Sequence, residues 1–236
     1  MNSIRKTAII VGALFIIATV ASSLTVVLTG PLNAPDGLIN VSANATQLII
    51  GALLLLIDSI AVVVIPIMLF PIFKKHNEAL ALGYVGARII EGVIFIVGVI
   101  SLLLLLTLSQ EFVKAGTPDV PYFQTLGTLL LAAHDWAFLL GLTVFSLGSL
   151  TLNYILYQSK LIPRWLSGWG FIGAALSLAA SLIPQLGYNL SSSIDTLLNS
   201  PIAVQEMVFA VWLIVKGFNS SAIASLSAKT DMNEII

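Results

Sequence analysis

The sequence predicts an all-α fold: a polytopic membrane protein built as a bundle of six transmembrane helices. Of its 236 residues, 58% are hydrophobic and only 9% are charged. The mean hydropathy is +1.04. Soluble domains carry about 25% charged residues, so a water-soluble fold of this size could not cover its surface with so few charges. The apolar residues also gather into six segments that are long enough to cross a bilayer.

Each predicted span is judged by its length. A transmembrane helix needs about 20 mostly apolar residues, because the hydrocarbon layer is about 30 Å thick and a helix rises about 1.5 Å per residue. Six segments meet this test: residues 7–30, 46–71, 79–107, 126–157, 165–187 and 200–218. They form one membrane domain over residues 1–218. A polar tail over residues 219–236 follows, which we expect to be cytoplasmic and partly disordered.

The first span follows two basic residues and therefore resembles a secretory signal. Its apolar run, residues 8–28, is longer than the usual signal core of about 7–15 residues. We therefore expect this helix to be retained. The alternative is cleavage, because residues 20–22 resemble a signal-peptidase site.

The second, third and fourth spans carry ionisable residues. Asp58 lies in the second span, Arg88 and Glu91 lie in the third, and the fourth contains His134 and Asp135. Arg88 and Glu91 together cost about 6 kcal/mol of insertion free energy, while each Leu, Ile, Val or Phe of the same span contributes about −0.3 to −0.6 kcal/mol. The apolar residues slightly outweigh the charges, so the third span still inserts.

The last two spans begin at recognisable signals. Pro163, Arg164 and Trp165 form an interface anchor ahead of the fifth span, with a cation and an indole at headgroup level. The fifth span also carries a stripe of small residues suited to close helix packing: Gly170, Gly173, Ser177 and Ser181. Ser200 is the expected N-cap of the sixth span, and Pro201 is its expected first helical residue, where the missing N–H costs nothing.

Basic residues at the span ends predict the orientation. They lie before the first span, between spans two and three, between spans four and five, and after the sixth: Arg5, Lys6, Lys74, Lys75, Lys160, Arg164, Lys216 and Lys229. The alternate loops, residues 31–45, 108–125 and 188–199, contain only Lys114. Since cytoplasmic loops carry the excess of Lys and Arg, we predict a multi-pass protein of the inner (plasma) membrane with both termini in the cytoplasm.

Arg88 and Glu91 are three residues apart, so they share one helical face and can pair. Tyr84 extends the same face. A charge at a helix centre costs about 2.5–3.5 kcal/mol on insertion scales, so such residues face a protein interior and have partners. Two interpretations are open: a structural ion pair that sets helix packing, or part of a pathway for a solute or proton.

The other ionisable residues predict one polar cluster. Counting the helical rise from each span end places Asp58 near the midplane, with the pair, and His134 and Glu206 in the outer half. Adjacent His134 and Asp135 diverge by about 100° and cannot form a dyad, but His134 can meet Glu206 or Asp58 across an interface. We expect a cluster that opens toward the outside. Its candidate residues are Asp58, Tyr84, Arg88, Glu91, His134, Asp135 and Glu206.

Several chemistries are disfavoured by the sequence. The chain has no cysteine, which excludes disulfides, thiolate metal sites and cysteine nucleophiles. It has no phosphate-cradling glycine loop, dinucleotide fingerprint or serine-nucleophile motif, so we expect no cofactor and no metal, and an enzymatic activity is less favoured than a non-enzymatic role. No basic tract suggests nucleic acid. The expected partners are the lipid bilayer, a small-molecule or ion ligand, and a second copy or another membrane protein.

Three segments carry a resemblance to a known family. They are Arg88-Ile-Ile-Glu91-Gly92, residues 161–168, and the final span from Pro201 to Phe218. Together they resemble the bacterial membrane family named domain of unknown function 4386, over nearly the whole chain up to Phe218. The resemblance implies a six-helix bacterial membrane protein and no particular activity. It also implies that certain residues match family pattern positions: Arg88, Glu91, Pro163, Trp165 and Glu206.

Three functions are consistent with these features. The first, which we favour, is transport or binding of a small molecule or ion, with the polar cluster as a binding or proton-coupling site. The second is an accessory or sensory membrane subunit, in which the ion pair is structural. The third is an intramembrane enzyme acting on a lipid or isoprenoid, with His134 and Glu206 as its acid–base pair.

Overall fold

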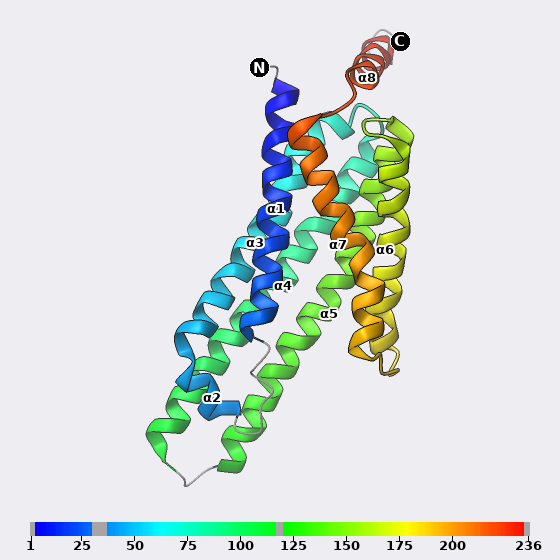
Figure 1. Ribbon diagram of the computed structural model, residues 1–236. Coiled ribbons are helices and arrows are strands. Elements are labelled where there is room, and N and C mark those ends of the chain that lie inside the picture. Colours follow the sequence, from blue (N-terminus) through cyan, green and yellow to red (C-terminus); the bar gives the residue numbers. More distant parts are fainter. Residues whose placement is uncertain (1–2, 30–36, 117–119, 234–236) are drawn as a thin grey trace.

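The computed structural model describes residues 3–29, 37–116 and 120–233, and every regular element in these ranges is a helix (Figure 1). The helices are α1 (Ser3–Thr29), α2 (Gly37–Ala43), α3 (Ala45–Phe73), α4 (Glu78–Ala115), α5 (Val120–Ser159), α6 (Arg164–Gln185), α7 (Ser192–Val215) and α8 (Ser220–Asn233). In the described ranges six of them, α1 and α3 to α7, are long and apolar enough to cross a membrane. The predicted all-α membrane fold is confirmed.

Two helices are much longer than the bilayer requires. α4 continues to Ala115 and α5 begins at Val120, whereas the predicted spans end at residue 107 and begin at residue 126. At about 1.5 Å per residue, either helix measures about 57–60 Å, against a hydrocarbon layer of about 30 Å. Figure 1 shows α3, α4 and α5 reaching furthest on the side away from the two termini.

The predicted start of the sixth span is wrong. α7 begins at Ser192, and Pro201 lies inside it. The Ser191 hydroxyl caps this helix by accepting from the Ile194 N–H at 3.4 Å. Pro201 cannot donate to the Leu197 carbonyl one turn earlier, and the Ser200 hydroxyl donates to that carbonyl instead, at 3.3 Å. The helix therefore tolerates its internal proline.

The tail after residue 218 was expected to be partly disordered, but its described part forms α8. Ala222 and Leu226, one turn apart, are nearly buried and join the main hydrophobic core. The Asn219 N–H donates to the Leu161 carbonyl at 2.9 Å, which ties the start of the segment to the bundle. Burial of this narrow apolar face stabilises a helix that its composition alone did not indicate. Residues 234–236 lie outside the described ranges.

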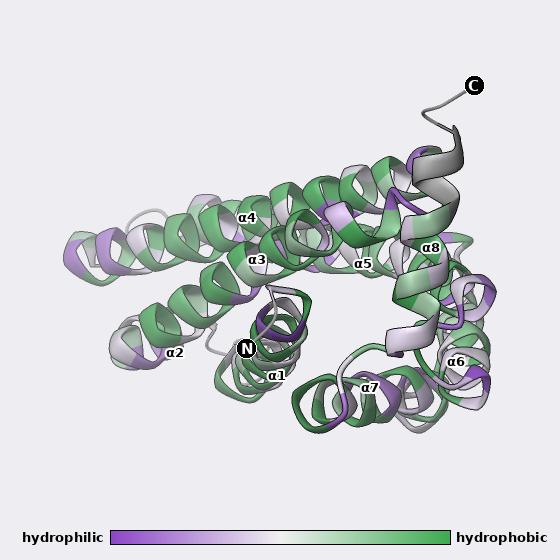
Figure 2. Ribbon diagram, turned by 90° about the horizontal axis from the view of Figure 1, so that it is seen from above, coloured by the Kyte–Doolittle hydropathy of each residue, from purple (hydrophilic) through white to green (hydrophobic). Residues whose placement is uncertain are grey.

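The six spanning helices form a ring. Each packs on its neighbours in chain order, and α1 packs on α7 to close the circle. Figure 2 shows this ring from above, with α8 lying across its edge. Large apolar side chains on the outside of the ring are about half exposed, among them Ile60, Ile90 and Val211. In a membrane protein this surface faces the lipid tails.

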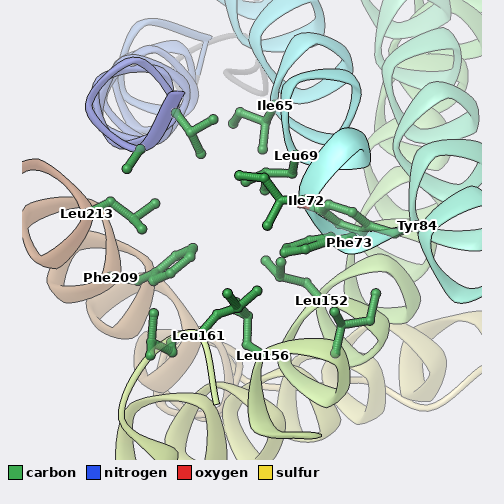
Figure 3. Close-up of a cluster of buried hydrophobic side chains, with 14 of the residues drawn as sticks. Ile65, Leu69, Ile72, Phe73, Tyr84, Leu152, Leu156, Leu161, Phe209 and Leu213 are labelled. Atoms are coloured by element: carbon green, nitrogen blue, oxygen red, sulfur yellow. The ribbon is translucent and has the colours of Figure 1, made fainter. Parts of the chain in front are cut away.

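An apolar cluster closes the ring on the side where the termini lie, hereafter the termini side (Figures 1 and 3). It joins the beginnings of α1 and α4 to the ends of α3, α5 and α7. Its members include Ile65, Leu69, Ile72, Phe73, Tyr84, Leu152, Leu156, Leu161, Phe209 and Leu213. Phe15 meets Phe209 edge to face, with ring centroids 5.4 Å apart. We call this cluster the plug.

Arg5 fastens α1 to α7 beside the plug. Its guanidinium donates to three carbonyls at the end of α7: Leu213 at 2.8 Å, Ile214 at 2.5 Å and Val215 at 3.2 Å. Carbonyls in the last turn of a helix have no partner within the helix, and that end carries partial negative charge. A cation that binds them therefore supplies hydrogen bonds and favourable electrostatics together.

The Arg5→Ala variant is expected to lower the free energy of unfolding by about 1.5–3 kcal/mol, because hydrogen bonds from a charged donor are lost and carbonyls are left without them. Denaturant titration in detergent micelles measures the change. Lys6→Ala is the matched control, since Lys6 is exposed on the same turn of α1. Equal stability of the two variants would show that the hydrogen bonds from Arg5 to the end of α7 do not stabilise the bundle.

The predicted small-residue stripe of α6 is buried against its neighbours. Thr143 of α5 donates to Ser181 at 3.0 Å, and Ser146 donates to Ser177 at 3.2 Å. Ser177 in turn donates to the Asn199 side-chain oxygen of α7 at 2.8 Å. Small side chains let the three backbones approach closely, and the hydroxyls then join them by hydrogen bonds.

Candidate functional site

A cavity of about 740 Å³ lies inside the ring, and all six spanning helices contribute to its wall. The volume is within the range of small-molecule sites. On α1 the lining residues run from Phe15, in the plug, to Thr29 at the far end of the helix. At that far end the wall includes exposed Ser23, Asp135 and Asp195. The cavity therefore opens away from the termini side and is closed by the plug at its other end.

A fully buried ion pair lies at the closed end of the cavity. The Arg88 Nη1 group donates to both carboxylate oxygens of Glu91, at 3.0 and 2.8 Å, and both side chains are 1% exposed. α4 presents the two residues on one face because they are three positions apart. The sequence-predicted pairing is present in the structure.

Aromatic rings hold the guanidinium from two directions. Its central carbon lies 5.8 Å from the Tyr84 ring centroid and 5.1 Å from that of Phe145. Both distances are in the range of a cation–π interaction. Tyr84, a predicted pathway residue, is fully buried in the plug and is not part of the cavity wall. Tyr84 therefore contacts the Arg88 guanidinium from the plug side of the cavity.

Two further carboxyl groups reach the same end of the cavity. Asp58 of α3 is 4% exposed, and Glu206 of α7 is 9% exposed. The Glu206 Oε1 atom lies 3.8 Å from the Arg88 Nη2 atom and accepts no hydrogen bond. None of the hydrogen bonds found among the described residues involves the Asp58 carboxyl group. The closed end of the cavity therefore holds three carboxyl groups and one guanidinium. Among the described residues, only the Glu91 carboxyl group is hydrogen-bonded to that guanidinium.

Glu206 lies deeper than its predicted position in the outer half. The prediction counted the helical rise from residue 200, but α7 begins a full two turns earlier. The contact with Arg88 accordingly places Glu206 beside the predicted midplane pair. The depth of Glu206 was therefore predicted wrongly because the start of α7 was predicted wrongly.

His134 and Asp135 lie nearer the mouth of the cavity. The His134 Nδ1 atom is 3.2 Å from the Gly98 carbonyl. Gly98 follows Arg88 on α4 by about three helical turns, which is about 15 Å along the axis. Asp135 is exposed at the wall. The structure brings Asp58, the ion pair and Glu206 together, and it separates His134 from Glu206.

Sequence reasoning missed several wall residues. Phe145 was read only as an apolar residue of its span, and Asp195 and Asn199 were assigned to a loop because the start of α7 was placed too late. α1 adds hydroxyl groups along one side: Thr19, Ser22, Ser23, Thr25 and Thr29. Four of them, Thr19, Ser22, Thr25 and Thr29, follow one another at intervals of three to four residues, which was a readable signal for a polar helix face.

The donor set does not resemble a metal centre. In the described part of the chain, no group of three or more His, Asp or Glu side chains is arranged to hold a metal ion. The wall instead combines separated carboxyl groups, hydroxyl groups and phenylalanine rings. Such a surface suits a ligand with both charged and apolar parts.

The fold and the cavity define a class: a multi-pass membrane protein whose six spanning helices enclose a polar site. The chain belongs to the family described as Domain of unknown function (DUF4386), whose sequence profile matches residues 10–217. That match covers nearly all of the spanning region and every candidate site residue. Comparisons with curated proteins and with solved structures gave no match.

Proposed function

We propose that this protein binds a small molecule or ion in the cavity and carries it across the membrane. The observation that carries the proposal is a large cavity with buried charges at its closed end and an apolar plug beyond them. Ionisable residues inside a membrane usually mark substrate or proton pathways. A cavity that reaches such residues from one side, with a closure on the other, has the form of one state of an alternating-access cycle.

The distribution of basic residues supports entry from outside the cell. The termini side carries Lys74, Lys160 and Lys216, and Arg164 lies 4.9 Å from the Tyr157 ring there. Cytoplasmic flanks of membrane helices are enriched in such residues. The termini side is then cytoplasmic, the membrane is the plasma membrane, and the cavity faces the exterior.

Passage to the other side requires the plug to separate. The seam between α1 and α7 is tightly packed, since a Cβ atom on Gly12 would lie 2.6 Å from the Ala210 carbonyl. Glu206 lies one turn before Ala210 on α7, and the Asp58 and Glu206 carboxyl groups both line the cavity, where they can exchange protons with it. Binding of a proton or a ligand to these carboxyl groups would change the charge at the closed end of the cavity. That change would shift the equilibrium between an arrangement of the helices that is open on one side of the membrane and one that is open on the other.

Thiol accessibility tests the proposal without knowledge of the substrate, because the chain has no cysteine of its own. The Ala203→Cys variant places one thiol on the cavity wall, three residues before Glu206. We expect a membrane-impermeant methanethiosulfonate reagent to label it from the outer side in right-side-out vesicles. Labelling is also expected from the inner side in inverted vesicles, because a transporter exposes its site alternately to both sides.

Val204→Cys is the matched control. Val204 is the next residue, is 51% exposed and lies outside the cavity wall, so its thiol would face lipid and resist labelling. Labelling of the Ala203→Cys variant from the outer side alone would contradict transport and leave a one-sided binding protein. Absence of labelling from both sides would contradict a water-accessible cavity.

A second candidate is an accessory or sensory subunit. The observation that favours it is the self-contained geometry of Arg88 and Glu91, which are buried and paired on one helix. In that role the pair sets helix packing, and a second copy or another membrane protein docks through the lipid-facing helices. The intramembrane enzyme has less support, because His134 and Glu206 lie far apart along the bundle.

A further inference from the structure

The wall of the cavity has a strongly uneven charge. Among the residues that the structure describes, five acidic residues line it, whereas only one Lys or Arg does. The acidic residues are Asp58, Glu91, Asp135, Asp195 and Glu206, and the basic one is Arg88. The whole chain is nearly neutral, with a formal charge of −1. The negative charge is therefore concentrated in this cavity, where a surrounding of low dielectric strengthens its field.

Two of the buried carboxyl groups, those of Asp58 and Glu206, accept no hydrogen bond from the residues that the structure describes. Arg88 gives both hydrogen bonds of its Nη1 group to Glu91, and Glu206 lies beyond hydrogen-bond distance at 3.8 Å. Asp58 is 4% exposed and Glu206 is 9% exposed, and neither carboxyl accepts a hydrogen bond in the described part of the chain. A buried charged group needs compensation. Glu206 receives part of it from Arg88 at 3.8 Å, and a cation in the cavity would supply compensation to both groups.

Aromatic rings line the same space. Phe15, Phe95, Phe138 and Phe145 all contribute to the wall. Phe95 and Phe138 stack with centroids 6.1 Å apart, while Phe145 already lies over the Arg88 guanidinium. The faces of such rings attract cations and also provide apolar contact. An anion would meet both the rings and the carboxyl groups unfavourably.

We propose that the ligand is an amphipathic organic cation, an ammonium-type group carried on an apolar body, whose charge is received by Asp58 and Glu206. This inference rests on the proposed function and names its substrate class. The apolar body lies against the phenylalanine rings, and the hydroxyl row of α1 faces the hydrated mouth. Anions of equal size are rejected by these carboxyl groups, which accept no hydrogen bond among the described residues.

Two probes of nearly equal size and opposite charge test the proposal: tetraphenylphosphonium and tetraphenylborate. Binding to the purified full-length protein is measured by equilibrium dialysis in a neutral maltoside detergent, with uptake by protein-free micelles subtracted. We expect saturable binding of the phosphonium and none of the borate. Asp58→Asn and Glu206→Gln are each expected to weaken phosphonium binding about tenfold or more, since each removes one charge from a poorly solvated site.

Glu111→Gln is the matched control, because it removes the same charge from a residue that is exposed, paired with Lys114 and outside the cavity wall. It is expected to bind the phosphonium as the wild type does. Equal binding of both probes, or unchanged phosphonium binding in both cavity variants, would overturn the inference. The comparison of the two probes needs no variant, so it stands even if a substitution impairs folding.

Failure of this inference is separable from failure of the proposed function. Two-sided labelling of the Ala203→Cys variant together with absent phosphonium binding would keep transport and remove the cationic ligand. Phosphonium binding together with labelling from the outer side alone would keep the ligand class and remove transport. Each result therefore decides one of the two proposals.

Discussion

The Arg88→Ala variant is expected to lose about 3–5 kcal/mol of stability, because removing one partner of a buried pair leaves the other charge uncompensated. Glu91 is 1% exposed and receives both of its hydrogen bonds from Arg88. Truncation also leaves a void between the rings of Tyr84 and Phe145, which now hold the guanidinium. A protein at the low end of the usual stability range of about 5–15 kcal/mol would then be only marginally folded.

The loss is measured by thermal and denaturant unfolding of purified protein. Arg164→Ala is the control, since Arg164 is exposed and contacts one aromatic ring at the membrane interface. An unchanged unfolding curve for the Arg88→Ala variant would show that the buried charges are compensated by something other than their pairing.

A double variant separates the structural role of the pair from a functional one. Replacing Arg88 by Met and Glu91 by Leu removes both charges and keeps most of the volume, and such replacements are often neutral or stabilising. We expect this variant to recover much of the stability lost by Arg88→Ala. If the pair serves transport, the double variant folds but loses the two-sided labelling at Ala203→Cys. Full retention of that labelling would show that the pair is structural and that two-sided access to the cavity does not depend on it.

Gly173 of α6 is expected to be highly sensitive to substitution. A Cβ atom there would lie 2.9 Å from the backbone nitrogen of Ile202 and 3.0 Å from its Cα atom. Backbone atoms of a packed helix cannot rotate away, so Gly173→Ala forces α6 and α7 apart. Overpacking of this kind costs about 1–3 kcal/mol, occasionally more, and Gly173→Leu is expected to exceed the alanine variant.

The same helix offers a matched control in Gly168. A Cβ atom at Gly168 meets no neighbour within 4 Å, so Gly168→Ala gains about 0.5–1 kcal/mol of helix stability through reduced backbone freedom. The two alanine variants should therefore shift the unfolding transition in opposite directions. Equal shifts would contradict the close α6–α7 contact.

The sequence predicted the spans well where local composition decides them. The membrane selects apolar stretches of sufficient length one segment at a time, and all six were found in this way. It also predicted the pairing of Arg88 with Glu91, because residues three positions apart on a helix are neighbours whatever the surrounding fold. The start of α7 was missed because Pro201 was taken as the first residue of the helix, although the cap at Ser191 is a local contact with Ile194. The helical tail was missed because the core contacts of α8 depend on partners elsewhere in the chain.

The sequence by itself determined that six apolar helices cross a membrane and that costly polar side chains lie within them. Only the tertiary structure decided that Asp58, the ion pair and Glu206 meet at the closed end of one cavity. The physical reason is that hydropathy and helical spacing are properties of single segments. The meeting of faces from α3, α4 and α7 depends on how all six helices pack into a ring, and closure of that ring between α1 and α7 is a contact between opposite ends of the chain.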